Sequence, residues 1–321
     1  MLSGCGSTPV ADRSRLVPRP AVVPAAIGVG SHVFVAVSVA TLWVTPTSAR
    51  TVDAPALAAP VRMRAWLASM STSTRRALTG RIETQALYGD PLTVIGTSGT
   101  WLHVVAPLQS THRDPRGYPG WVPRRQVTSH QPTRTSSTAT VTALTAWLRD
   151  SAGNRTTEIS FGTRLPVLSI GSANVRVATP TGTMLRVALS KVAVRTGTAA
   201  VYTATRASIV ATAKRFLGLT YLWGGRSGFA LDCSGLTGLV FGLHGIRLPR
   251  DADDQSHAGT AVARSAARSA DLAFYGPAAA PTHVALYVSS STLLQAPNAS
   301  RPVGLVAASD MPTPVRVSRL F

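Results

Sequence analysis

Cys233, one of two cysteines in the chain, stands where a thiol could be activated. It follows the glycine-rich stretch 221–228, and Asp232 directly before it is a suitable helix N-cap. Cys233 would then lie in a first helical turn, where free backbone N–H groups and the helix dipole favour a thiolate. A thiolate is a strong nucleophile when a base lies within reach. Because cysteine is also among the most often buried residues, a packed, inert thiol is the alternative.

Three histidines follow Cys233 and are candidates for that base. His244 would lie about 16 Å away along the same helix, which is too far for proton transfer. His257 lies in a polar segment and stays open as a candidate. His283 lies in the alternating run 282–288, which predicts a strand.

A hairpin would give His283 a polar partner. A three- or five-residue turn centred on Ser289 would place Gln295 opposite His283 on the same face of the sheet. A Cys–His pair with an amide that orients the imidazole is the papain-like arrangement. These residue types therefore predict nucleophilic thiol chemistry with Cys233, His283 and Gln295.

The elements that must hold these residues form a mixed segment over 207–321. Apolar residues at helical spacing precede Gly218, and the Cys233 helix follows. Three strand-like runs then complete the segment: 271–275, 282–288 and 292–297. A helical start with a strand-rich end predicts an α+β domain.

Two segments before it show strand periodicity and Gly, Ser and Pro turns, over 60–128 and 141–196. The stretches 86–104 and 159–177 repeat one pattern: an aromatic–Gly pair, an apolar strand, a turn and another strand. The polar linker 128–140 separates the two segments. We therefore expect two small β-barrels in tandem.

Residues 1–49 have the composition of a targeting segment. Arginines precede the apolar run 33–44, and small residues follow it, as in a signal peptide. The alternative is an uncleaved anchor, which would engage the membrane. Either would export the protein to the cell envelope or the medium. Removal of the segment would leave Cys233 without a disulfide partner, so its thiol must be buried or used.

The formal net charge of +19 comes mostly from scattered arginines that form no compact basic block. This charge fits an anionic envelope polymer, or it reflects base composition alone. Nucleic acid is not an expected partner. No histidine–carboxylate cluster has zinc spacing, so we expect neither a metal nor another cofactor. We also expect a monomer.

The run "YLWGGRSGFALDCSGL", followed by "DLAFYG", "THVALYV" and "LLQAP", resembles the NlpC/p60 family of bacterial cell-wall cysteine peptidases. The two β segments resemble bacterial SH3-like domains. The resemblance implies a papain-like NlpC/p60 catalytic domain over 207–321, preceded by SH3-like barrels over 60–128 and 141–196. This architecture is known for γ-D-glutamyl-L-diamino acid endopeptidases. The implied partners are peptidoglycan stem peptides, L-Ala-γ-D-Glu-diamino acid.

The same resemblance implies the roles of individual residues. Cys233 would be the nucleophile, His283 the base and Gln295 the third polar residue, a position where the family most often has histidine. Further residues would contact the substrate: Tyr221, Asp232, Ser234 and Ser256.

In relatives of this architecture, the first barrel binds the free amine of an N-terminal L-Ala. Glu83 and Tyr118 match the carboxylate and the tyrosine that do so. A buried ammonium needs a paired carboxylate, which agrees with this role. The alternatives are a solvated strand charge for Glu83 and an ordinary barrel aromatic for Tyr118.

Two other functions compete with this interpretation. A catalytically silent wall-binding protein would use the barrels and the basic surface, but the intact Cys233, His283 and Gln295 argue against it. A thiol amidase or acyltransferase would act on another substrate. An acyl chain would give Glu83 no reason to be present, so Glu83 discriminates between these functions.

Overall fold

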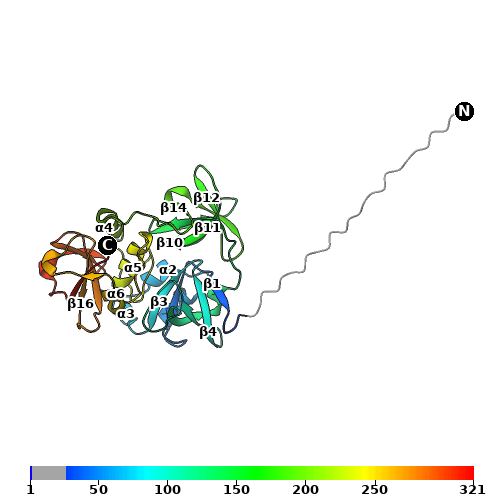
Figure 1. Ribbon diagram of the computed structural model, residues 1–321. Helices are drawn as coiled ribbons and strands as arrows, with labels where there is room; N and C mark the ends of the chain where they lie inside the picture. The colour runs from blue at the N-terminus through cyan, green and yellow to red at the C-terminus, as the bar shows by residue number, and fades with distance from the viewer. Residues whose placement is uncertain (2–26) are drawn as a thin grey trace.

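The computed structural model describes residue 1 and residues 27–321, which form three units along the chain (Figure 1). The first contains β1 (His32–Val35), β2 (Val39–Trp43), β3 (Ile82–Leu87), β4 (Pro91–Ser98), β5 (Trp101–Ala106), β6 (Tyr118–Pro123), η2 (Arg124–Gln126) and β7 (Val127–Thr128). The second contains β8 (Ser137–Val141), β9 (Thr145–Arg149), β10 (Arg155–Ser160), β11 (Arg164–Ile170), β12 (Asn174–Ala178), β13 (Met184–Ala188), η3 (Leu189–Lys191) and β14 (Val192–Thr196).

These two β units share one topology. Their strand orders are β3-β2-β6-β5-β4-β1-β7 and β10-β9-β13-β12-β11-β8-β14, which coincide when β1 is aligned with β8. Tyr88–Gly89 and Phe161–Gly162 precede the fourth strand of each unit, and both glycines have φ +84°. A side chain at this left-handed φ would be strained, which explains the repeated glycine. The internal repeat predicted from the sequence is confirmed.

The apolar run 33–44 belongs to the first sheet. β1 pairs with β4 and β7, and β2 pairs with β3 and β6. The side chains of Val33, Val35, Leu42 and Trp43 are fully buried there. A short apolar run buried in a sheet has the same composition as a signal-peptide core, and the sequence alone does not separate them.

The prediction of a signal peptide or anchor over 1–49 is therefore wrong for residues 32–44, and the first unit begins at His32 instead of residue 60. The rest of that prediction falls largely on residues 2–26, which lie outside the described residues. Among the described residues, no helix has the length and hydrophobicity needed to cross a membrane.

An insertion between β2 and β3 distinguishes the first unit from the second. It contains η1 (Thr51–Asp53), α1 (Ala54–Leu57), α2 (Met63–Ala68) and α3 (Thr72–Arg76). The buried carboxylate of Asp53 accepts hydrogen bonds from Arg50 and from the Trp66 indole. Arg64 on α2 pairs with Glu158 at 2.7 Å, so the insertion also joins the first unit to the second.

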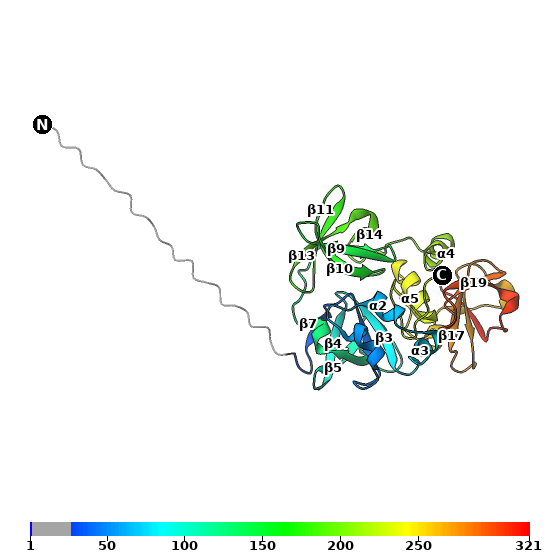
Figure 2. The ribbon, with the colours of Figure 1, turned by 180° about the vertical axis from the view of Figure 1, so that it is seen from behind.

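The third unit combines helices with one antiparallel sheet. It contains α4 (Arg206–Lys214), α5 (Cys233–Leu243), α6 (Ala252–Ser256), β15 (Thr260–Ala261), η4 (Arg264–Ala266), β16 (Leu272–Tyr275), β17 (His283–Tyr287), β18 (Thr292–Gln295), β19 (Gly304–Ala307), η5 (Ala308–Asp310) and β20 (Arg316–Arg319). The strand order is β15-β20-β16-β17-β18-β19. Helix α5 packs against β17 and lies between this sheet and the β units in Figures 1 and 2.

The first and third units share a continuous hydrophobic core. The Trp223 indole donates to the carbonyl of Ile82 at 3.1 Å, and the Arg226 N–H donates to Gln85 Oε1 at 3.0 Å. Strand β3 therefore lies directly beside the segment that leads into Cys233.

Candidate active site

Cys233 is the first residue of α5, as the sequence predicted. Asp232 caps the helix, and its carboxylate accepts the Gly235 N–H at 2.7 Å. A Cβ at position 235 would clash with the carbonyl oxygen of Gly225, so a glycine is needed there. The helix start is thus held tightly against the preceding turn.

Cys233 is buried, with 7% of the residue exposed. Burial raises the pKa of Cys233 to about 12, and the negative charge of Asp232 adds to the rise. Backbone N–H groups of Val284 and Ser234 and the charge of Arg250 oppose this rise without cancelling it. Burial thus acts against the effect expected of the helix start, because desolvation disfavours the charged thiolate. The resting group is a neutral thiol that needs a base.

His283 begins β17, and its Nε2 lies 2.7 Å from Gln295 Oε1 on β18. An amide oxygen can only accept a hydrogen bond, so Nε2 carries the proton and Nδ1 is left free to accept one. Burial lowers the pKa of His283, against the Gln295 hydrogen bond, which raises it. The imidazole is therefore neutral near pH 7. Because the next residue, Val284, directs its N–H at the Cys233 thiol, base and nucleophile meet where α5 packs on β17.

The hairpin register differs from the predicted one. Pairs Leu286–Leu294 and Tyr287–Leu293 centre the turn on Ser290 instead of Ser289. The shift moves each partner by two residues, which keeps every side chain on its face of the sheet. His283 therefore still reaches Gln295, now on a diagonal.

The other two histidines are bound elsewhere. His244 is buried, with Nδ1 2.8 Å from the Val240 carbonyl and Nε2 2.8 Å from Ser208 Oγ. His257 Nδ1 lies 3.0 Å from the carbonyl of Asp253 in its own helix. These contacts leave His283 as the histidine beside Cys233.

Arg250 is a buried residue that the sequence analysis missed. Its guanidinium contacts both Asp232 oxygens, at 2.7 and 3.1 Å, and Ser234 Oγ at 2.9 Å. Its Nε donates to Thr84 Oγ1 on β3 at 2.7 Å. Asp232 and Ser234 thus both bind Arg250 at the start of α5. A substrate contact by either residue stays a prediction.

Tyr221 and Ser256, which were also predicted to contact the substrate, have different surroundings. Burial and the nearby charges of Cys233 and Asp232 raise the pKa of Tyr221, which places its hydroxyl near the thiol. Ser256 ends α6, and its buried hydroxyl donates to the carbonyl of Asp253 at 2.6 Å. The Ser256 side chain is therefore engaged within its own helix.

Glu83 on β3 and Tyr118 at the start of β6 share one cation, Arg113. One terminal nitrogen of Arg113 lies 2.9 Å from Glu83 Oε1, while the other binds Glu83 Oε2 and lies 3.2 Å from the Tyr118 oxygen. The Tyr118 hydroxyl donates to Asp251 Oδ2 at 2.7 Å. The two residues predicted to bind a peptide amine thus lie together, and both contact the side chain of Arg113.

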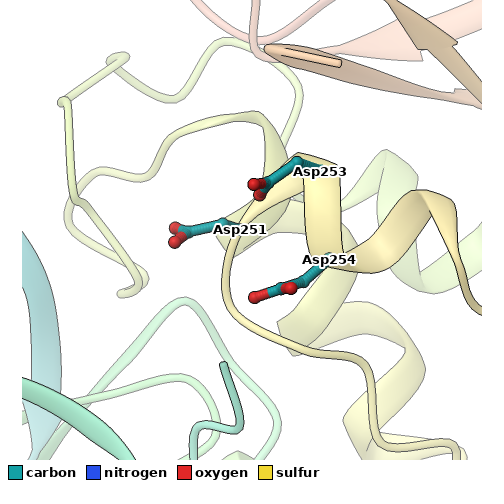
Figure 3. A group of neighbouring side chains, drawn as sticks. All are labelled: Asp251, Asp253 and Asp254. Atoms are coloured by element: carbon teal, nitrogen blue, oxygen red, sulfur yellow. The ribbon is translucent and has the colours of Figure 1, made fainter. Parts of the chain in front are cut away.

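Asp251, Asp253 and Asp254 form an acidic group at the start of α6 (Figure 3), with one oxygen of each within 4.8 Å of the others. Asp254 Oδ1 lies 2.9 Å from His112 Nδ1, and Asp254 raises the pKa of His112. Asp251 accepts the Tyr118 hydroxyl. Asp251 and Asp254 therefore form hydrogen bonds with residues of the first unit, which links that unit to α6.

Comparisons with known proteins agree with this geometry. Residues 218–314 match the NlpC/P60 family, and residues 141–194 match the YKFC SH3b2 domain. A γ-D-glutamyl-L-lysine dipeptidyl-peptidase of Bacillus cereus is 35% identical over 286 residues, which cover 86% of each chain. An enzyme of the same name from Bacillus subtilis is 34% identical over 85% of this chain and 92% of its own.

A crystal structure of an NlpC/P60 family protein from Bacillus cereus has a similar fold. The TM-score is 0.85 at 32% sequence identity, over 90% of this chain and 99% of that one. The likeness therefore covers all three units and not the C-terminal unit alone.

Proposed function

Because the chain belongs to the NlpC/P60 family of cell-wall peptidases, we propose that it hydrolyses the bond between γ-D-glutamate and the diamino acid of peptidoglycan stem peptides. The observation that carries this proposal is Cys233 in the first turn of α5, beside a His283 that Gln295 orients. Two relatives of at least 34% identity bear the name γ-D-glutamyl-L-lysine dipeptidyl-peptidase, which supplies the substrate class. The chain is a cysteine peptidase of this type.

The geometry supports a two-step acyl transfer. His283 Nδ1 takes the thiol proton, and the Cys233 sulfur attacks the γ-glutamyl carbonyl carbon. The developing oxyanion lies near backbone N–H groups at the start of α5. His283 returns the proton to the leaving α-amine of the diamino acid as the C–N bond breaks. Water then hydrolyses the thioester with His283 as base, which restores the thiol and releases the acyl part.

The neutral resting pair suits this cycle. A thiol with a raised pKa does not lose its proton to solvent at pH 7, so proton transfer to His283 accompanies attack. Buried surroundings also strengthen the interaction between the transient thiolate and imidazolium. Substrate binding, which excludes further water, favours the reaction in the same way.

We further propose that the peptide carries a free N-terminal L-Ala whose ammonium binds Glu83 and Tyr118. This assignment is supported by the carboxylate and phenol that the structure places together on one cation. The acyl product is then L-Ala-D-Glu. Asp232, Ser234, Tyr221 and Ser256 remain proposed contacts to the rest of the stem peptide.

The proposal extends to the whole chain. The first unit, residues 32–128, is also an SH3-like barrel, like the SH3b unit that follows it. This assignment is supported by its strand order, which repeats that of the SH3b unit. The protein acts as a monomer and without a cofactor. Its place is the cell envelope or the medium, an assignment that rests on the substrate. Immunoblots of cell fractions test that location.

The test is product analysis by mass spectrometry with the purified full chain. L-Ala-γ-D-Glu-L-Lys and L-Ala-γ-D-Glu-diaminopimelate are supplied separately, each with a free or an acetylated amine. We expect release of L-Ala-D-Glu, with a lower kcat/KM for the acetylated peptides. Absence of release from every peptide, together with retention on purified cell wall, would support a binding protein instead.

A further inference from the structure

The position proposed for the substrate ammonium holds a cation of the protein itself. Arg113 contacts both carboxylate oxygens of Glu83 and the Tyr118 oxygen, and its guanidinium carbon lies 5.2 Å from the centre of the Tyr118 ring. A carboxylate oxygen and an aromatic face are also the groups that hold an alkylammonium. Arg113 therefore makes the contacts that a peptide amine would make.

A substrate ammonium and Arg113 would compete for one negative charge. The Glu83 side chain is 14% exposed, so its carboxylate has little room for a second cation beside the guanidinium. The Tyr118 hydroxyl hydrogen is directed at Asp251, which leaves its oxygen to accept a single strong donor. Binding of the peptide amine thus requires that Arg113 leave.

Arg113 is placed so that it can leave. It lies in the segment 107–117 between β5 and β6, and its side chain is 38% exposed. Neighbouring residues fix the segment: His112 bonds to Asp254, and the Ser110 carbonyl accepts the Arg250 N–H at 2.9 Å. The arginine can therefore rotate into solvent while the backbone around it stays anchored to the third unit.

We propose that Arg113 is a specificity-determining residue that occupies the amine position in the free enzyme and is displaced by the free N-terminus of the peptide. This inference rests on the proposed function. An acylated peptide carries no charge that could displace the guanidinium. The ion pair between Arg113 and Glu83 therefore favours peptides with a free amine. For a peptide with a free amine, Arg113 reduces the apparent affinity in proportion to the fraction of enzyme in which the position is open.

The test is the kinetics of Arg113→Met, which removes the cation and keeps the length of the side chain. KM for L-Ala-γ-D-Glu-L-Lys should fall about fivefold, because a partly exposed bidentate ion pair of modest strength no longer competes. KM for the acetylated peptide should not fall, because Glu83 then carries an unneutralised charge. The value of kcat should stay within about twofold, since Arg113 does not touch the reacting atoms.

Three further variants make the result specific. Arg116→Met is the matched control, because Arg116 lies in the same segment and pairs with Asp114. It should leave both KM values unchanged. Arg113→Lys retains a competing cation and should stay near the parent. In the Glu83→Gln background, Arg113→Met should no longer lower KM for the free peptide.

An unchanged or increased KM of the folded Arg113→Met protein for the free peptide would overturn the inference. An equal fall in KM for the free and acetylated peptides would overturn it as well, since charge would not be the cause. Thermal unfolding of each variant shows whether it is folded. If the parent cleaves none of the peptides, the proposed function fails, and this outcome is distinct from a parent that cleaves with no effect of Arg113.

Discussion

Burial acts on Cys233 and His283 in opposite directions, and each shift favours the neutral form. The thiol pKa rises to about 12, and the imidazole pKa falls below its ordinary value. The proton therefore stays on sulfur until a substrate is attacked. The Gln295 oxygen holds the proton on Nε2 of His283 and leaves Nδ1 free, so Gln295 determines which imidazole nitrogen can take the thiol proton.

The pH dependence of kcat/KM follows from the lowered pKa of His283. Activity needs the neutral imidazole, so it is lost as the pH falls through that pKa. Since burial places this pKa below the ordinary value of about 6.5, the acid limb should lie below pH 6.5. A pH–rate profile of the parent measures it. An acid limb above pH 7 would contradict the assignment of His283 as a buried base.

Gln295→Leu should reduce kcat/KM about 10- to 100-fold, because the histidine tautomer loses its hydrogen-bond acceptor. The same change should move the acid limb to lower pH. The hydrogen bond with Gln295 raises the pKa of His283, so its loss lowers that pKa. Gln295→His, which places another hydrogen-bonding side chain at this position, should keep most of the activity. A Gln295→Leu enzyme with the rate and pH profile of the parent would refute the orienting role.

At the scale of secondary structure, the start of α5 is set by close contact between helix and turn. Gly235→Ala should destabilise the protein by about 2 kcal/mol or more, because the added Cβ meets the Gly225 carbonyl. Gly242 lies in the same helix with open space around it. Gly242→Ala should therefore stabilise the protein by up to about 1 kcal/mol. Urea unfolding compares the two variants, and equal effects would contradict this account.

The sequence predicts elements better than contacts between them. The Asp232 cap and the strand that carries His283 follow local rules, and an error of two in the hairpin register left Gln295 on the correct face. Arg250 and Arg113 were missed because each has a partner far away along the chain, Thr84 and Glu83 respectively. The contact of Arg250 with Thr84 joins residues 166 positions apart, and no spacing in the sequence indicates it.

At the scale of the whole molecule, the first β unit is part of the catalytic structure. Its core continues into the third unit, and β3 supplies Glu83 and also contacts Arg250 and the segment before Cys233. The misread run 33–44 shows the limit of composition as evidence, because burial in a sheet and burial in a membrane select similar residues. What separated them was pairing with strands far along the chain.

Removal of residues 1–49 should prevent folding, because it deletes β1 and β2 from the interior of the first sheet. Among the described residues, seven buried hydrophobic side chains would be lost: Val33, Val35, Val37, Val39, Ala40, Leu42 and Trp43. A chain that begins at residue 27 keeps every strand of the described residues and should fold. Circular dichroism and size-exclusion chromatography compare the two. A folded 50–321 chain of parental stability would contradict the assignment of β1 and β2.

The most direct test of the central claim is detection of the acyl-enzyme on Cys233. The parent is mixed with L-Ala-γ-D-Glu-L-Lys, stopped with acid during turnover and digested, and its peptides are analysed by mass spectrometry. We expect the L-Ala-D-Glu acyl group on the peptide that contains Cys233, and neither adduct nor product from Cys233→Ala. Release of the dipeptide by folded Cys233→Ala at the parental rate would contradict the claim, because the thiol would then not be the nucleophile.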